Sequence, residues 1–472
     1  MTTATGAAGA PPNERDGVWA PARRQLTLGL ALTISLVAVE ALAIATVMPT
    51  VSDELGGIEL YGWVFSAFFL GTLIGIVVAG QSADRLGAAP AFTVGLALFA
   101  VGLLVGGLTP SMIVLVLARF VQGFGAGAVP AIGYVCIGRG YPEALRPRMF
   151  AVMASAWVVP GIVGPAIAGV VEQSIGWRWV FLGLLPLVLV AGAFTIPAMR
   201  PIGPGEPGDG SSDVRSRLPW ALAVAAGAAA VLAGIAAENV VVVAVLVIGG
   251  LAIGGPAYLR LVPAGTVRAA PGMPAAIAAR ATLTFAFFGV DAYVPLAIAD
   301  VRHLGTLWIT LNLTTTTLAW TAAAWVQERL VVRVGARRLV VAGHGIILVS
   351  ILITGLFLVE AVPFAVGLVG WTIGGFGIGL AYAPISLTVL AEADPGREGA
   401  ASASLQLTEQ LGVAIGIGLG GAAVAIGARN GWEPAAGIAI AWTLGAAAAT
   451  LGMLIARRLP GPTSPVATTA AT

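Results

Sequence analysis

Long unbroken apolar runs constrain this chain more than any other feature. Fourteen runs reach about 20 residues, the length that a helix needs to cross about 30 Å of hydrocarbon. Only 10% of the 472 residues are charged, and the mean hydropathy is +0.96. A soluble domain averages about 25% charged residues, so soluble, disordered, collagen-like and coiled-coil proteins are excluded. Because a transmembrane barrel would show short alternating strands, the runs predict an all-α polytopic membrane protein.

The limits of the runs define the predicted spans. They cover residues 25–48, 60–82, 90–109, 111–135, 148–171, 178–199, 218–237, 239–259, 274–299, 306–326, 338–358, 362–391, 400–427 and 435–456. The first run carries Glu40 and is too long for the apolar core of a signal peptide, so we expect it to remain as a span. Glu238-Asn239 is the only polar break between spans seven and eight and predicts a tight hairpin.

The arginines indicate how the spans are oriented. All 24 basic residues are arginine. When successive loops alternate across the membrane, 19 arginines fall on the side of the N-terminus and only three on the other side. Basic residues collect in cytoplasmic loops, so both termini are expected in the cytoplasm and the protein in the cell inner (plasma) membrane. No basic block lies in a soluble region, and nucleic-acid binding is therefore not expected.

An internal repeat divides the spans into two halves. Arg85 and Arg333, Gly87 and Gly335, and Gly164 and Gly412 are each separated by 248 residues. The repeat predicts two six-helix bundles in the same orientation, with two inserted helices and 14 transmembrane helices in total. The predicted segments are an N-terminal tail (1–24), the first bundle (25–199), a linker (200–217), the inserted hairpin (218–259), the second bundle (274–456) and a C-terminal tail (457–472).

Four motifs in a fixed order carry a resemblance to a known family. They are Gly80-x-x-Ala83-Asp84-Arg85-x-Gly87, Arg119-x-x-Gln122-Gly123-x-Gly125-Ala126, Gly161-x-x-Gly164-Pro165-x-x-x-Gly169 and Gly176-Trp177-Arg178-Trp179-Val180-Phe181. With them the chain resembles the major facilitator superfamily, specifically its fourteen-span drug:proton antiporter branch. The resemblance implies a secondary active transporter that exports lipophilic or amphipathic small molecules, cationic ones included, by proton-coupled antiport and alternating access.

The chain departs from the family pattern at several positions. In span one, Glu40, Leu42 and Ala45 stand where the family usually has an Asp followed by Thr and Asn. Ala88 and Ala89 replace the basic residues that usually follow the loop glycine. The first departure bears on the type of substrate, and the second weakens an account of gating by that loop.

Charged residues inside the spans are the main candidates for proton coupling and substrate binding. A charge at the bilayer centre costs at least about 2.5–3.5 kcal/mol, so each one needs a reason. Glu40 and Arg119 lie at matching depths on spans one and four, so we expect them to be neighbours. Asp291 lies near the position in the second half that corresponds to Glu40. Glu409, in span thirteen, is the fourth candidate. The alternatives are a structural Glu40–Arg119 pair, a polar helix contact for Asp291, and snorkelling toward the cytoplasm for Glu409, which we also expect of Arg280.

A loop motif and a helix motif are candidates for the moving parts. The resemblance implies a gating loop formed by Gly80, Asp84, Arg85 and Gly87 and by their repeat counterparts Arg333 and Gly335. Asp84 is expected near the cytoplasmic end of a second-half helix, span thirteen, in an outward-facing state, and the alternative is a solvated turn. The antiporter helix motif comprises Gly161, Gly164, Pro165 and Gly169, which serve as a hinge or as tight static packing.

Other functions find less support in the sequence. Export of an endogenous lipid, siderophore or metabolite remains an alternative. Thr314–Thr317 is the only polar run that would suit a channel, and the spans show no catalytic cluster for a membrane-embedded transferase, so we expect no enzyme. No motif predicts a metal or cofactor, and no Walker motif predicts ATP use. The expected partners are a small-molecule substrate, protons and membrane lipid, without an obligate protein partner.

Overall fold

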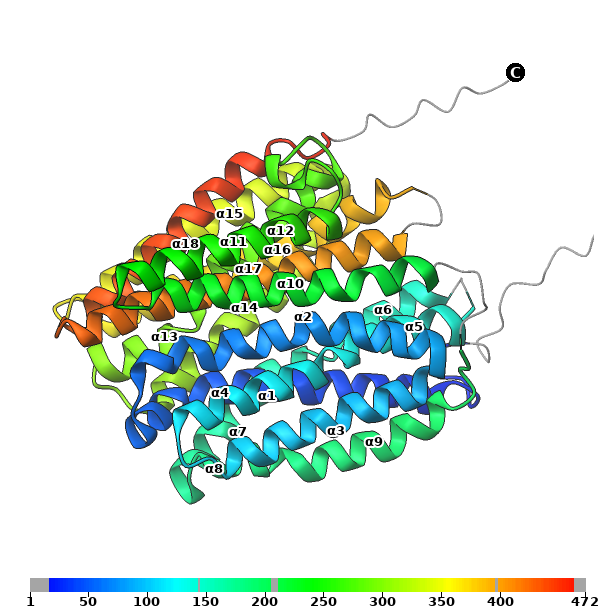
Figure 1. Ribbon diagram of the computed structural model, residues 1–472, viewed down its shortest axis with the longest axis horizontal. Coiled ribbons are helices and arrows are strands. Elements are labelled where there is room, and N and C mark those ends of the chain that lie inside the picture. The colour runs from blue at the N-terminus through cyan, green and yellow to red at the C-terminus, as the bar shows by residue number, and fades with distance from the viewer. Residues whose placement is uncertain (1–16, 143–144, 205–210, 395–397, 462–472) are drawn as a thin grey trace, which may run out of the picture.

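The computed structural model describes residues 17–142, 145–204, 211–394 and 398–461. Most of both predicted tails and the middle of the predicted linker lie outside these residues. The described chain is helical, and the long helices run side by side between two faces (Figure 1). We call the face at which α1 (Arg24–Leu55) begins and α18 (Pro434–Ala456) ends the terminal face, and the other one the opposite face.

Helices of the first half follow the predicted spans closely. They are α1 (Arg24–Leu55), α2 (Tyr61–Leu86), α3 (Ala88–Gly107), α4 (Met112–Ala126), α5 (Ala128–Gly140), α6 (Arg146–Ser155), α7 (Val158–Ile175), α8 (Arg178–Leu182) and α9 (Leu184–Met199), with a short 3-10 turn η2 (Ile58–Leu60). Span four is divided into α4 and α5, span five into α6 and α7, and span six into α8 and α9.

The hairpin and the second half follow in the same order. They comprise α10 (Ser211–Ile235), α11 (Val240–Leu261), α12 (Met273–Asp291), α13 (Val294–Leu296), α14 (Thr306–Val334), α15 (Ala336–Gly355), α16 (Phe364–Ala391), α17 (Glu398–Arg429) and α18 (Pro434–Ala456). The short turns η4 (Thr266–Arg268), η5 (Ala297–Val301) and η6 (Leu356–Leu358) lie between them.

The all-α polytopic fold predicted from the apolar runs is confirmed. Thirteen helical segments of the described chain are long and apolar enough to cross a membrane. The remaining predicted span corresponds to α14, which is 29 residues long but carries a run of threonines and, in its last two turns, Glu328, Arg329 and Arg333. These polar residues lower its hydropathy without shortening the helix.

The repeated glycines occupy equivalent backbone positions. Gly87 ends α2 with φ 90°, and Gly335 ends α14 with φ 85°. Each amide donates back to the carbonyl four residues earlier, at 3.0 Å from Ala83 O and 3.0 Å from Val331 O. Residues other than glycine are strained at such φ values, so both halves require glycine where the chain reverses into the next helix.

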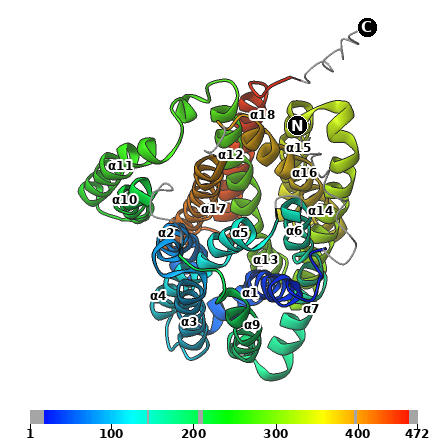
Figure 2. The same ribbon diagram turned by 90° about the vertical axis from the view of Figure 1, so that its right-hand side faces the viewer.

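Two helix seams join the halves. Along one seam α2 packs against α17, where the Ser66 hydroxyl donates to Ala414 O at 2.9 Å. Along the other seam α7 packs against α14, where the Thr310 hydroxyl donates to Pro165 O at 3.2 Å. The hairpin of α10 and α11 lies to one side of both halves, with α10 against α2 and α17 (Figure 2).

Candidate functional site

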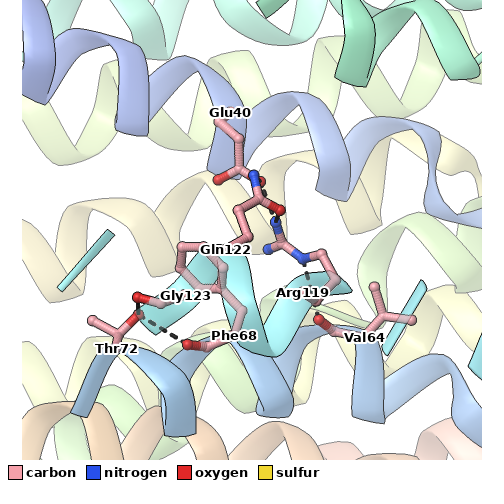
Figure 3. A network of polar contacts seen from close by, with 7 residues as sticks. All are labelled: Glu40, Val64, Phe68, Thr72, Arg119, Gln122 and Gly123. Carbon is pink, nitrogen blue, oxygen red and sulfur yellow. Dashed lines mark hydrogen bonds and ion pairs between the residues drawn. The ribbon is translucent and has the colours of Figure 1, made fainter. Parts of the chain in front are cut away.

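A buried polar cluster lies inside the first half, between α1 and α4. The Arg119 guanidinium forms an ion pair with Glu40 Oε1 and donates to Gln122 Oε1 at 2.7 Å, and Gln122 Nε2 donates to Glu40 Oε1 at 3.0 Å (Figure 3). The exposed fractions are 0% for Glu40, 2% for Arg119 and 0% for Gln122. The expectation that Glu40 and Arg119 are neighbours therefore holds in the structure, and Gln122 completes the cluster.

Close helix packing holds Arg119 in place. Its Nε donates to Val64 O at 3.3 Å, and its guanidinium lies 4.2 Å from the centroid of the Phe68 ring. A side chain at Gly123 would overlap the Phe68 backbone, so glycine lets α4 approach α2 closely. The Thr72 hydroxyl donates to Gly123 O at 3.1 Å across the same contact (Figure 3).

Glu40 is the least satisfied member of the cluster. It lies near the middle of the 32-residue α1, about 24 Å along the helix from Arg24 at 1.5 Å per residue. Its Oε2 atom is buried and accepts no hydrogen bond from the described residues. A carboxylate in this position retains an acceptor to which a proton or a substrate group can add.

Asp291 lies in the second half, apart from this cluster. Its Oδ1 accepts a 2.7 Å hydrogen bond from the Trp371 indole, and its side chain is partly buried. Trp371 stacks on Phe287 at 5.0 Å, and Trp320 lies 5.5 Å from Phe287 and 5.8 Å from Tyr382, measured between ring centroids. Trp371 therefore belongs to a chain of rings, whereas Trp157, in the first half, is 47% exposed.

Glu409 lies at the other end of this chain of rings. It accepts a 2.7 Å hydrogen bond from the Tyr382 hydroxyl, and its Oε2 lies 3.7 Å from Arg280 Nη1. Arg280 is 0% exposed, lies 3.6 Å from the Tyr382 ring centroid and donates to Ser386 Oγ at 2.5 Å. The expectation that Arg280 snorkels to the surface is wrong, because α16 and α17 enclose its guanidinium with a carboxylate and a ring.

The loop residues of the first motif meet a partner within their own half. Asp84 Oδ1 lies 2.6 Å from Arg139 Nη2, at the end of α5. Both side chains are about one-third exposed, and Arg85 and Arg333 are exposed. Gly80 has open space around it. The contact between Asp84 and a second-half helix was expected for an outward-facing state, and for that state it stays a prediction.

The glycines of the helix motif lie where α7 crosses between the halves. Gly161 faces Thr317 and Gly169 faces Thr310, both on α14. Gly164 faces α1 on the other side, near Val39 and Leu42. The motif therefore forms the second seam between the halves, and it also reaches the helix that carries Glu40.

Sequence reasoning did not find Glu172 and Arg139. Glu172, near the end of α7, accepts hydrogen bonds from Thr50 on α1 at 3.1 Å and from Thr306 on α14 at 2.9 Å, so one carboxylate joins both halves. The only signal for Glu172 in the sequence was its place as an acidic residue at the end of an apolar run. The signal for Arg139 was weaker still, because arginines are common at the ends of spans. No group of three metal-binding side chains occurs among the described residues.

Taken together, repeated bundles of membrane-spanning helices, close seams between them and buried charges define a polytopic membrane transporter. The family model described as Major Facilitator Superfamily matches residues 28–417. The chain belongs to the major facilitator superfamily, a family of transporters of small molecules.

Relatives with similar sequences carry efflux descriptions. A probable multidrug-efflux transporter of Mycobacterium tuberculosis (strain ATCC 25618 / H37Rv) is 28% identical over 463 residues, covering 91% of this chain and 95% of that protein. The multidrug efflux pump SdrM of Staphylococcus aureus (strain N315) is 26% identical over 164 residues, 35% of this chain and 37% of that protein.

Solved structures share the fold at low sequence identity. The POT family transporter PepTSo aligns with a TM-score of 0.67 and 17% identity, over 92% of this chain and 98% of that one. The human organic anion transporter MFSD10 (TETRAN) aligns with a TM-score of 0.61 and 14% identity, over 92% of this chain and 99% of that one. At these identities the likeness shows the fold alone.

Proposed function

We propose that this protein is a proton-coupled antiporter that exports lipophilic or amphipathic small molecules, cationic ones included, by alternating access. The buried Glu40–Arg119–Gln122 cluster carries the proposal. Both termini then lie in the cytoplasm, as the distribution of the arginines predicts, and the terminal face is the cytoplasmic one. The multidrug-efflux relatives support the direction of transport and the kind of substrate.

Glu40 is the proposed proton carrier. A buried carboxylate must be paired or protonated, because an isolated charge in the membrane is costly. Arg119 stabilises the charged form, and protonation of Glu40 weakens that pair. A substrate cation that approaches Glu40 competes with the proton for the same carboxylate. Competition for one site couples proton entry to substrate exit without direct contact between the two.

The contacts between the halves support a state closed toward the opposite face. Tyr61 on α2 donates to Ala292 O at 3.2 Å across the halves, and Glu172 on α7 reaches Thr306 at 2.9 Å. Tyr61 is 0% exposed. In the proposed cycle these contacts open when the terminal face closes, and the Asp84–Arg139 pair then rearranges with the loop.

The chain of rings in the second half is the proposed substrate wall. Trp371, Phe287, Trp320 and Tyr382 link Asp291 at one end to Glu409 at the other. Flat apolar molecules stack on aromatic faces, and cations are attracted to the same faces. An acid at each end suits molecules that combine a flat apolar body with a positive charge.

Transport of ethidium into inverted membrane vesicles with an acidic interior tests the proposal. The wild-type protein should concentrate this flat aromatic cation. Vesicles with Glu40→Gln should accumulate no more ethidium than vesicles that lack the protein. Binding of ethidium to the solubilised variant should be weaker without the Glu40 charge but should persist, because the rings are unchanged. Glu328→Gln is the matched control, since Glu328 is exposed at the end of α14, and it should transport normally.

Two results would contradict parts of the proposal. If wild-type vesicles accumulate ethidium equally with and without a pH gradient, proton coupling is wrong. If Glu40→Gln still concentrates ethidium against its gradient, Glu40 is not the coupling acid, and Asp291→Asn and Glu409→Gln become the next variants.

A further inference from the structure

A hollow of about 360 Å³ lies at the terminal face, where the hairpin meets the second half. Arg217 from α10, Arg260 from α11 and Asp394 after α16 contribute its charged groups. Val262 and Met273 are among the apolar residues that line the rest. The hollow is distinct from the buried Glu40 cluster, and neither the sequence motifs nor the proposed transport cycle uses it.

The wall of the hollow is fixed on both sides. The Arg260 guanidinium lies 3.9 Å from the centroid of the Trp220 ring, so a residue of α10 holds the charge of α11 in place. On the side of the second half, Ser404 Oγ donates to Leu261 O at 2.9 Å, and the Tyr258 hydroxyl lies 3.2 Å from Thr408 Oγ1. These contacts attach the hairpin to α17 beside the hollow.

The position of the hollow corresponds to the level of lipid headgroups. α11 has 22 residues and is about 33 Å long, enough to cross the hydrocarbon layer, and the hollow lies at its last turn. Only 11% of the membrane-spanning part of α11 is buried, and its exposed large apolar residues are Val, Ile and Leu. Acyl chains that extend from the hollow would therefore lie along apolar helix surface.

The charges of the hollow select one class of headgroup. Two arginines and one aspartate leave the lining with one net positive charge. A phosphate diester accepts hydrogen bonds from guanidinium groups, and hydroxyls beyond the phosphate can donate to the aspartate. A zwitterionic headgroup would leave one arginine without a counter-charge, and a free phosphate would leave the apolar residues uncovered.

We propose that this hollow binds the headgroup of an anionic phospholipid of the phosphatidylglycerol type. Arg217 and Arg260 hold the phosphate, and Asp394 accepts hydrogen bonds from the headgroup hydroxyls. The lipid lies between the hairpin and the second half, and it holds α11 against α17 beside the Ser404 contact.

Native mass spectrometry of the full-length protein, purified and then incubated with phosphatidylglycerol, tests this site. Arg217→Gln and Arg260→Gln should each weaken retention of this lipid about fivefold, since a basic residue near the headgroups contributes about this factor toward anionic lipid. Arg338→Gln is the matched control, because Arg338 is exposed at the start of α15, and its retention should equal that of wild type. Thermal unfolding with phosphatidylcholine alone checks that all variants fold.

Competing molecules identify the source of the phosphate. Bound isotope-labelled phosphatidylglycerol should be displaced at least about fivefold less well by phosphatidylethanolamine or phosphatidylcholine than by unlabelled phosphatidylglycerol. Inorganic phosphate should not displace it. Equal retention by the two hollow variants and the control would overturn the site. Displacement by inorganic phosphate at low concentration would overturn the lipid as its ligand.

Discussion

Arg119 shows how much a single side chain matters at the residue scale. Without it, Glu40 would be a buried carboxylate with only Gln122 for a partner, and loss of one member of a buried pair costs about 3–5 kcal/mol. We expect Arg119→Gln to lower the temperature of thermal unfolding in detergent. The loss should be larger at pH 8 than at pH 5, because protonation of Glu40 removes the uncompensated charge.

The double variant separates this explanation from a loss of packing. Glu40→Gln/Arg119→Gln should unfold at a higher temperature than Arg119→Gln and should show no difference between the two pH values. If the double variant is as unstable as the single one, the contacts of Arg119 with Val64 and Phe68 explain its importance, and the ion pair does not.

At the scale of the element, the contact between α7 and α14 depends on the absence of a side chain at Gly161. A Cβ atom there would overlap Thr317, and overpacking of this kind costs about 1–3 kcal/mol. We expect Gly161→Ala to destabilise the protein and to slow ethidium transport, and Thr317→Ala to restore both by making room. Gly255→Ala, with open space around it on α11, is the control. If the effects of Gly161→Ala and Thr317→Ala on thermal unfolding are simply additive, the two positions are not in tight contact and this explanation is wrong.

At the scale of the whole molecule, transport by alternating access requires the seam near the opposite face to open. A Cβ atom added at Gly169 would lie 3.4 Å from Thr306 Cγ2, a position that the Sγ atom of a cysteine at 306 can occupy, so cysteines at these two positions are placed to form a disulfide. In a background with Cys136→Ala, we expect Gly169→Cys/Thr306→Cys to cross-link under oxidation, to lose ethidium transport and to regain it with a reducing agent. Unimpaired transport by the cross-linked protein would contradict opening at this seam.

Several local features could be predicted from residues alone. Gly87 and Gly335 were predicted as equivalent points of a repeat, and both end a helix with positive φ. The matching depths of Glu40 and Arg119 predicted a contact because two charges in hydrocarbon have few other ways to be satisfied. The same argument did not extend to Arg280, because a charge close to the membrane surface can reach water as well as a partner inside the protein.

Sequence by itself therefore determined the number of spans, the repeat and the pairing of the deepest charges, since each follows from the cost of placing polar groups in lipid. Only the tertiary structure decided which helices meet across the halves. It placed Glu172 between Thr50 and Thr306, Asp84 beside Arg139, and Arg217 near Arg260 around a hollow. Hydropathy does not predict these contacts, because a polar residue near the end of a span can face water, lipid headgroups or another helix at a similar cost in free energy. The packing of whole helices selects among these environments.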